Sequence, residues 1–449
     1  MRKLHMITGL YLFQNDLRLD DNPALKLACE EVDQLICLYC LPIQGPNRLP
    51  YTVSQFGEHR MRFLLQSLDA LKQSLANKGQ ELVITLLHPL DAIPTLISRY
   101  NVTALYRSQH AGYNENRIWS YLETHYPFLT FTTTSSHTLF ETSELPFALS
   151  DLPTTFSQFR KHIEKHPIQS CLPSITALPQ PPKALPVCAE LPTVTTITPP
   201  VSPNSIHHNF MGGESKALQH LEHYFATQAP SHYKETRNAL DDWQSSTKFS
   251  PWLALGCLSP RRIIERLQRY HQEVEQNSST EWILFELLWR EYFQWYAHSH
   301  QGKLFLFQGI KSCSPNTSFY AERYQRWCAG NTPFPIVNAC MKQLNQTGYM
   351  SNRGRQLVAS CFVHELNLDW RYGAAYFEQH LLDYDVASNW GNWQYLAGVG
   401  ADPRGHRKFD LAKQTTIYDP DHHFIRKWKG NEHDGKIDTV DAADWPIRD

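Results

Sequence analysis

Short apolar runs alternate with amphipathic stretches over the first 135 residues of the chain. The apolar runs predict five strands, over Leu10–Phe13, Gln34–Cys40, Leu82–Leu86, Ala104–Arg107 and Leu129–Thr133. The stretches between them predict helices over Pro23–Glu31, Glu58–Lys78, Asp91–Tyr100 and Glu115–Tyr126. Because strands alternate with helices, we expect an α/β doubly wound domain with a five-stranded parallel sheet over residues 1–135.

The pattern changes after residue 135. Residues 173–203 hold nine prolines, a composition that favours an extended path over the surface rather than a packed element. We therefore expect a long interdomain linker over residues 136–212.

Helical spacing of apolar residues dominates from Gly213 onward. It predicts helices over Glu214–Phe225, Pro260–Asn277, Thr280–His298, Phe319–Ala329, Pro335–Gln346, Arg353–Leu366 and Tyr372–Leu382. Residues 213–430 are expected to form an all-α domain, and the polar residues 431–449 a C-terminal tail.

Composition agrees with this division. A chain of 449 residues is too long for one ordinary core, and 42% hydrophobic with 19% charged residues is typical of a globular protein. The net charge of -2 excludes a protein that is basic overall, although local basic patches remain possible. The aromatic content of 12% serves either a helical core or ring stacking on a cofactor or nucleobases.

Cysteine usage indicates a reducing compartment. Cys37 and Cys40 have CxxC spacing, but they lie within an apolar run that reads as a buried strand, which disfavours a redox or zinc site. The N-terminus lacks the apolar core of a signal peptide, and no apolar run is long enough for a membrane span. We expect a cytoplasmic protein of bacterial type, or one in an organelle, without a metal and without a membrane partner.

The turn after the first strand lacks a GxGxxG sequence and reads Gln14-Asn15-Asp16. A dinucleotide bound by this sheet in the usual way is therefore not expected. A second segment, Ser246-Thr247-Lys248-Phe249-Ser250-Pro251, precedes a helix with hydroxyls and a lysine, which suits either simple capping or phosphate.

Helical spacing places Glu286, Trp289 and Arg290 on one face of a helix. A carboxyl, an indole and a guanidinium in one stripe could line a pocket for a base. For this helix taken alone, an intrahelical Glu286–Arg290 ion pair is the simpler interpretation.

Two stretches about thirty residues apart carry the densest chemistry. The first, Gly348–Gln356, includes Asn352, Arg355 and Gln356 in one helical turn. The second, Asp383–Tyr395, brings Asp383, Asp385 and Asn389 together with several aromatic residues. The two aspartates lack the further ligands and the glycine of a calcium loop. An Arg355–Asp383 pair beside a polarisable ring fits the pattern better.

These segments, together with Leu12–Leu25, resemble the photolyase/cryptochrome family over almost the whole chain. The run Tyr349–Gln356 and the run Asn389–Trp393 are similar to those of DASH-type cryptochromes. In duplex-specific relatives Met and Trp usually stand where this chain has Gln356 and Tyr395.

The resemblance implies a bound FAD, bent into a U between helices. It assigns the pyrophosphate region to Tyr233 and to Ser246, Thr247, Lys248, Phe249 and Ser250. It places Asn352, Arg355, Asp383 and Asp385 around the isoalloxazine, with Asn389 facing flavin N5.

The resemblance further implies an enzyme of deoxyribodipyrimidine photo-lyase type. Light excites reduced FAD, one electron passes to a cyclobutane pyrimidine dimer mainly in single-stranded DNA, and the electron returns after the ring splits. Glu286 would hydrogen-bond the dimer. Other lesion contacts would come from Trp289, Arg290, Asn352, Arg353, Gln356 and Tyr395. A monomer is expected.

An electron chain of three tryptophans is typical of the family. Trp393 and Trp370 match its inner two members, but the outermost position is Thr317. Either Trp327, Tyr320 or Tyr324 replaces it, or photoreduction of the flavin is slower than in the family.

The family also often carries an antenna, usually methenyltetrahydrofolate in DASH-type members. The segment Tyr113–Arg117 matches the antenna pattern loosely, so a deazaflavin or an empty site stays open.

Two rival functions remain. One is a blue-light photoreceptor that signals and repairs weakly or not at all, and the other is a redox flavoenzyme without photochemistry. Repair of (6–4) lesions is disfavoured, because position 353, next to Asn352, is arginine rather than histidine.

Overall fold

The computed structural model describes residues 6–41, 56–186, 210–311, 314–402 and 407–434. Its N-terminal part is a five-stranded parallel sheet in the order β3-β2-β1-β4-β5. The strands are β1 (Thr8–Leu12), β2 (Gln34–Cys40), β3 (Leu82–Thr85), β4 (Ala104–Ser108) and β5 (Thr130–Thr134). The expected α/β fold class is confirmed, with strand limits within two residues of the prediction.

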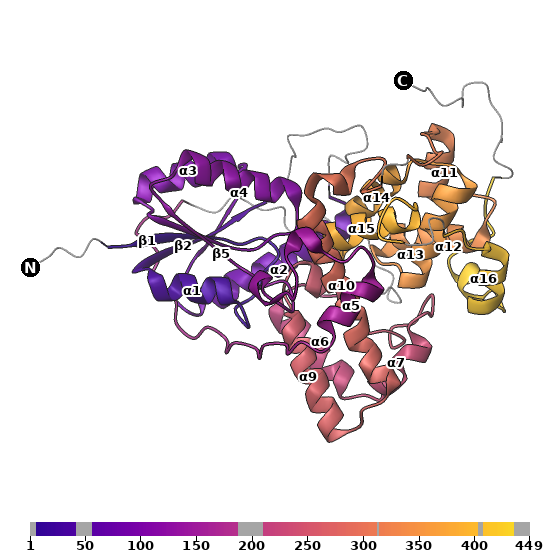
Figure 1. Cartoon of the computed structure of the whole chain (residues 1–449), viewed down its shortest axis with the longest axis horizontal. Helices are drawn as coiled ribbons and strands as arrows, with labels where there is room; N and C mark the ends of the chain where they lie inside the picture. The colour runs from indigo at the N-terminus through magenta and orange to yellow at the C-terminus, as the bar shows by residue number, and fades with distance from the viewer. Residues whose placement is uncertain (1–5, 42–55, 187–209, 312–313, 403–406, 435–449) are drawn as a thin grey trace, which may run out of the picture.

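Helices cover both faces of this sheet (Figure 1). On one face lie α1 (Pro23–Glu31) and α2 (Glu58–Ala76), which pack against side chains such as Tyr11 and Cys37. On the other lie α3 (Pro89–Tyr100) and α4 (Tyr113–His125), which pack against Leu10 and Leu38. Because side chains alternate along a strand, Cys37 and Cys40 point to opposite faces of β2 and cannot share a metal ion.

The segment expected as a linker is partly helical. It contains short 3-10 turns over Thr142–Glu144 and Leu149–Asp151 and the amphipathic helix α5 (Phe156–Ile163). Thr155 caps α5, which buries Phe156, Phe159 and Ile163. Residues 187–209 of the expected linker lie outside the described residues.

The rest of the described chain is helical, as expected. The helices are α6 (Glu214–Phe225), α7 (Ala229–Thr236), α8 (Ser250–Ala254), α9 (Pro260–Glu273), α10 (Ser278–His300), α11 (Ala321–Ala329), α12 (Pro335–Thr347), α13 (Asn352–Ser360), α14 (Trp370–His380), α15 (Val386–Leu396), α16 (Leu411–Tyr418) and α17 (His423–Lys427). A 3-10 turn, Gln301–Phe305, follows α10, and a π-helical turn, Cys361–Glu365, follows α13. Most of the expected tail, from residue 435, lies outside the described residues.

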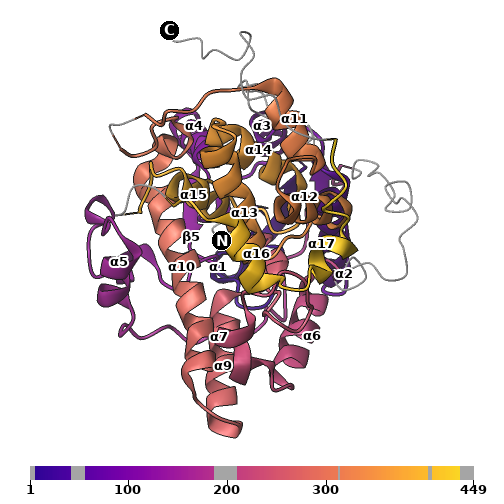
Figure 2. The ribbon, with the colours of Figure 1, turned by 90° about the vertical axis from the view of Figure 1, so that its right-hand side faces the viewer.

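Helix α10 is central to the packing of the helical domain. It begins at a capping box formed by Asn277 and Thr280 and runs for 23 residues. Helices α5, α7 and α15 pack along it (Figure 2). It therefore carries side chains from the outer surface of the domain to the junction with the sheet.

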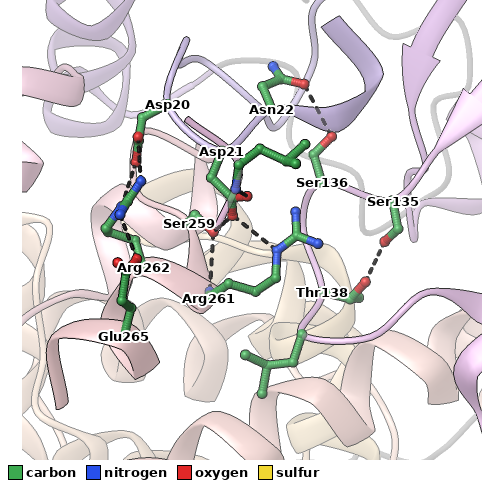
Figure 3. A network of polar contacts seen from close by, with 12 residues as sticks. Asp20, Asp21, Asn22, Ser135, Ser136, Thr138, Ser259, Arg261, Arg262 and Glu265 are labelled. Carbon is green, nitrogen blue, oxygen red and sulfur yellow. Dashed lines mark hydrogen bonds and ion pairs between the residues drawn. The ribbon is translucent and has the colours of Figure 1, made fainter. Parts of the chain in front are cut away.

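The loop between β1 and α1 joins the two domains (Figure 3). Asp20 accepts both of its contacts from Arg262, at 2.7 and 2.9 Å. Asp21 is fully buried and accepts from Ser259 and, at 3.0 Å, from Arg261 at the start of α9. The Asp16–Asp21 loop, which lacks the sequence for binding a dinucleotide, thus serves as an interdomain clamp.

The clamp depends on a close backbone approach at Gly256. This residue has φ +66°, and a Cβ built there would lie 1.9 Å from the carbonyl oxygen of Asn15. The Gly256 carbonyl also accepts from Arg18 at 2.9 Å. Only glycine fits such a conformation and such a contact without displacing backbone.

A membrane-spanning helix would need a long apolar stretch. None of the helices in the described ranges has one.

Candidate cofactor and substrate site

A cavity of about 210 Å³ lies in the helical domain. It is bounded by α7, α8, α10 and the loop before α15. Nine residues expected at the site line it: Tyr233, Thr247, Phe249, Ser250, Glu286, Arg290, Arg355, Asp383 and Asp385. The other expected residues do not line it: Ser246, Lys248, Trp289, Asn352, Arg353, Trp370, Gln356, Asn389, Trp393 and Tyr395. Tyr233 and Asp385, which are 152 positions apart in the sequence, therefore share one cavity.

Arg355 and Asp383 form the expected pair. Ser351 caps α13 through its contact with the Gly354 N–H, which fixes Arg355 in the first turn of that helix. The Arg355 guanidinium lies 2.8 Å from Asp383 Oδ2. Asp383 Oδ1 is buried and has no hydrogen-bond partner among the described residues. An unpaired buried carboxylate oxygen at a cavity wall suits an N–H or O–H donor of a ligand.

Asp385 is the N-cap of α15 and accepts from the Ser388 N–H at 2.7 Å. Gln294 from α10 donates to both of its oxygens, at 2.9 and 3.0 Å. Burial by itself would raise the pKa of Asp385, but the nearby His137 and Arg290 and the Ser388 N–H hold that pKa well below its usual value. The cavity wall therefore keeps a negative charge at this point.

Arg290 does not form the intrahelical pair with Glu286. Its guanidinium donates to the His137 carbonyl at 2.7 Å and lies 2.6 Å from His137 Nε2. Glu286 instead pairs with Arg237 at 2.6 Å and accepts from Trp282 at 3.0 Å. The simpler interpretation of the helix was wrong, because Arg237, directly after α7, pairs with Glu286, and His137, in the segment after β5, binds Arg290.

Burial raises the pKa of Glu286, although Arg237 opposes that rise. The side chain is 28% exposed, so it lies at an opening of the cavity rather than behind it. A carboxyl with a raised pKa at a cavity opening is suited to share a proton with a ligand.

The Ser246–Ser250 segment contributes only part of its polar groups. Thr247, Phe249 and Ser250 line the cavity. Lys248 has φ +54° and is 7% exposed, and its amine lies 2.9 Å from Ser246 Oγ and over the Tyr349 ring. The lysine charge is thus held beside the cavity by local contacts.

Asn389 and the two expected electron-transfer tryptophans are buried but do not line the cavity. Asn389 Nδ2 donates to the Ala374 carbonyl at 2.9 Å, which fixes the amide. Trp393 is 2% exposed and lies against Gly373, where a Cβ would come within 2.3 Å of its ring. Trp370 is fully buried and donates to the Phe307 carbonyl.

Trp289 and Tyr395 lie side by side, with ring centroids 5.9 Å apart. Phe156 of α5 stacks on Trp289 at 3.8 Å, so the segment expected as a linker covers one face of this indole. The Arg407 guanidinium lies 4.4 Å from the Tyr395 ring centre. These aromatic rings already have packing partners within the chain.

The remaining residues expected to contact the lesion do not line the cavity. Asn352 is exposed at the start of α13, and Gln356 is half-buried. Arg353 donates to Asn238 at 3.2 Å and lies over the Tyr418 ring of α16.

The sequence did not predict five polar or aromatic residues that contact the expected ones: His137, Arg237, Trp282, Gln294 and Ser388. Gln294 lies two turns beyond Glu286 on α10, where helical spacing could have indicated it. His137 and Arg237 come from other elements, and no local pattern marks them.

A second cleft, of about 630 Å³, lies between α4, the end of β4 and α10. Tyr113, Asn116 and Arg117 from the expected antenna segment line it. Two further lining groups, Arg107 Nε and Trp119 Nε1, are buried donors without a hydrogen-bond partner among the described residues. This cleft therefore suits a ligand rich in acceptors.

The first cavity offers a different donor set, which fits FAD. Arg355 provides positive charge, the unpaired Asp383 oxygen accepts an N–H, and Thr247 and Ser250 bring hydroxyls to its edge. No group of three metal-ligating side chains occurs in the part of the chain that the structure describes.

Comparisons with known proteins agree with this geometry. Residues 9–183 match the family described as DNA photolyase, and residues 282–436 match the FAD binding domain of DNA photolyase. Cryptochrome DASH of Idiomarina loihiensis is 54% identical over 442 residues, which cover 98% of this chain and 96% of the relative. Cryptochrome DASH of Vibrio parahaemolyticus is 52% identical over 98% of this chain and 97% of its own length.

Among solved structures, a cryptochrome of Synechocystis sp. superposes with a TM-score of 0.87 and 37% identity, over 94% of this chain and 89% of that one. The chain is a flavoprotein that belongs to the photolyase/cryptochrome family, in its DASH-type branch.

Proposed function

We propose that this protein repairs cyclobutane pyrimidine dimers in light, mainly in single-stranded or locally unpaired DNA. The observation that carries the proposal is that Glu286 lines the same cavity as Arg355, Asp383 and Asp385. A lesion held by Glu286 would therefore lie next to the cofactor, within reach of direct electron transfer. Bound FAD would supply light absorption and the electron, and the protein would supply binding and electrostatics.

Glu286 stabilises the negative charge that develops on the lesion. Its raised pKa allows the carboxyl to share a proton with a pyrimidine carbonyl as charge builds up there. Arg237 and Trp282 hold the carboxyl in place through their contacts of 2.6 and 3.0 Å. Asn389, whose amide is held by the Ala374 carbonyl, would be the residue that favours the reduced form of the bound flavin.

The preference for single strands follows from the weak stacking that Tyr395 and Gln356 provide for a flipped-out lesion. Flipping a lesion out of a duplex costs a few kcal/mol, and less from an unpaired strand. Tyr395 already has Trp289 and Arg407 on its ring, and Gln356 is a polar side chain. These groups recover less stacking energy than Trp and Met would. Asn352 and Arg353 would contact the lesion or its phosphate rim, and Arg290, which lines the shared cavity, would lie against both the lesion and the cofactor.

The test compares a dimer-containing single strand with the same sequence as a duplex, under blue light with fully reduced FAD. We expect rapid repair of the single strand and slow repair of the duplex. Glu286→Gln should lower repair by about tenfold to a hundredfold, while FAD binding stays unchanged. Glu281→Gln, an exposed position on the same helix, is the matched control.

Equal repair of duplex and single strand would overturn the strand preference. No repair of either substrate by the reduced protein would overturn the enzymatic function. That second outcome would favour a blue-light photoreceptor, the alternative function that is also compatible with membership of this family.

For flavin reduction we propose a route through Trp393 and Trp327, with Trp370 as a side branch. Thr317, where the family has its outermost tryptophan, has no redox-active side chain. The Trp327 ring lies 6.2 Å from Trp393 and 5.5 Å from Tyr376, and Tyr376 lies 6.4 Å from Tyr324, which is half-buried. An electron from a thiol in solution would enter at Tyr324.

Trp327→Phe should then slow the light-driven bleaching of oxidised flavin by about tenfold in the presence of a thiol. Tyr320→Phe should leave the rate unchanged, because Arg323 covers that ring, at 4.3 Å from its centre. An unchanged rate in Trp327→Phe would refute this route.

We also propose that the second cleft holds an antenna, with methenyltetrahydrofolate as the first candidate. The carbonyl and carboxylate groups of a folate match the unpaired donors Arg107 Nε and Trp119 Nε1. An absorption spectrum of the purified protein would reveal a folate band beside that of flavin. Loss of that band in Arg107→Met, with the flavin retained, would support the placement. A deazaflavin spectrum, or flavin alone, would refute the folate.

A further inference from the structure

His137 joins the N-terminal domain to the wall of the cofactor cavity. It lies three residues after β5, in a segment whose next residues are held by Glu291 of α10 through the Leu139 and Phe140 N–H groups. Its ring is 6% exposed. It reaches Arg290 at 2.6 Å and Asp385 at 3.4 Å, and both of these residues line the cavity.

The contact with Arg290 determines where the imidazole carries its proton. A guanidinium offers only donors, so His137 Nε2 must be the acceptor. The ring is then neutral with its proton on Nδ1, and Nε2 has no proton to give to Asp385. Asp385 does not need one, because Gln294 and the Ser388 N–H already donate to it. Burial and the charge of Arg290 agree with this state, since both lower the pKa of His137, to about 4.

His137 therefore holds Arg290 twice, through Nε2 and through its own carbonyl at 2.7 Å. Two acceptors from one residue fix a planar guanidinium in direction as well as position. The cation that faces the cavity beside Asp385 is thus oriented by a residue of the other domain.

We propose that His137 is a positioning residue of the FAD site: its neutral imidazole fixes Arg290 against the cavity wall, so that docking of the N-terminal domain sets the affinity of the cavity for FAD. This inference rests on FAD binding by the helical domain, and it is independent of whether the protein repairs DNA. His137 Nδ1 is buried without a partner among the described residues, so the Nε2 side carries its function.

Two amides distinguish the ring nitrogens. The amide of His137→Gln places an oxygen near the position of Nε2, whereas that of His137→Asn reaches only the position of Nδ1. His137→Leu removes both and keeps an apolar side chain of similar size. His162→Asn, at an exposed histidine of α5, is the control.

Each variant is stripped of FAD and titrated with it, with flavin fluorescence as the readout. We expect at least tenfold weaker binding for His137→Leu and His137→Asn, and binding within about threefold of wild type for His137→Gln and the control. Equal binding by all variants, or equal loss in the Gln and Asn variants, would overturn the proposal. The comparison of Gln with Asn decides the matter even if the Leu variant does not fold.

A second readout needs no cofactor. Imidazole ¹⁵N spectra of the apoprotein, assigned by the loss of one signal in His137→Gln, should show a neutral ring protonated on Nδ1 at pH 7. A doubly protonated ring, or a proton on Nε2, would contradict the proposed contact. Repair assays are not part of either readout, so a failure of the proposed repair activity would remain distinguishable.

Discussion

Buried aspartates serve opposite purposes in two regions of this molecule. At the domain junction Asp21 is saturated, because Ser259, Arg261 and the Leu172 N–H all donate to it. At the candidate cofactor cavity Asp383 receives one contact from Arg355, and its second oxygen has no partner among the described residues.

The difference follows from the cost of burying polar groups. A buried carboxylate that is fully hydrogen-bonded rigidifies its surroundings, whereas an unpaired oxygen is a standing penalty that a ligand can remove. Saturation at the junction therefore indicates a structural role, and incomplete pairing at the cavity indicates binding. Variants at the two places should separate stability from cofactor affinity.

The largest effect is expected at the saturated junction. Asp21→Ala leaves Arg261 buried without its charge partner, which should lower the free energy of unfolding by about 3–5 kcal/mol. Urea unfolding of the holoprotein measures this loss, with the exposed Asp69→Ala as the control. A loss below about 1 kcal/mol would mean that the clamp contributes little.

Gly256→Ala should break the same junction through the backbone. The left-handed conformation and the overlap with the Asn15 carbonyl together should lower the free energy of unfolding by roughly 2–4 kcal/mol. Gly79→Ala is the matched control, because Gly79 also has a positive φ, +74°, but its nearest contact is the Gln180 side chain at 3.4 Å. If both variants lose the same stability, the close approach at Gly256 is not a cause of strain.

Glu291 tests the segment between the two regions. Burial raises its pKa to about 7, from 4.5. Between pH 4.5 and 7 the Glu291 carboxyl is therefore protonated in the folded state and ionised in the unfolded state. Because the folded state binds more protons in this range, the free energy of unfolding should fall as pH rises from 4.5 to 7. Relative to Glu291→Gln, wild type should lose about 2 kcal/mol of unfolding free energy between pH 5 and 7.5.

Urea unfolding of both proteins at each pH gives this difference. The buried histidines His137 and His298 have pKa values lowered to about 4, so their contribution to the free energy of unfolding falls as the pH becomes acidic. This contribution is the same in wild type and in Glu291→Gln, and it cancels in the difference between them. The exposed Glu281→Gln should show no such difference. A difference independent of pH would refute the raised pKa.

The smallest change in the free energy of unfolding is expected at Asp383, whose pairing in the cavity is incomplete. Asp383→Asn should weaken FAD binding by about tenfold, because the ligand loses a charged acceptor. Unfolding of the apoprotein should change by less than about 1 kcal/mol. FAD titration and urea unfolding of the same preparation give both values. A large loss of apoprotein stability would remove the contrast with Asp21.

The sequence predicted the elements whose pattern is local. The five strands and α6 lie within two residues of their expected limits, since periods of 2 and 3.6 residues are visible in one dimension. Helices α5, α7, α15, α16 and α17 fell outside the expected set. Several of them are short and gain their stability from packing, as Phe156 of α5 does against Trp289.

The site divides in the same way. Ser351 and Asp385 cap their helices through neighbours in sequence, and the Arg355–Asp383 pair was predicted from the chemistry of two motifs. The partners of Glu286 and Arg290 were not predicted. Arg237 and His137 reach them from 49 and 153 residues away, and no local pattern records such a contact.

By itself the sequence determined the α/β and all-α division and the family, and it predicted nine residues that line one cavity, because these depend on periodicity and on motifs. Only the tertiary structure decided that the β1–α1 loop clamps the domains, and that His137 rather than Glu286 holds Arg290. The physical reason is that a buried polar group takes whichever partner the folded chain brings within about 3 Å, and that choice depends on long-range packing.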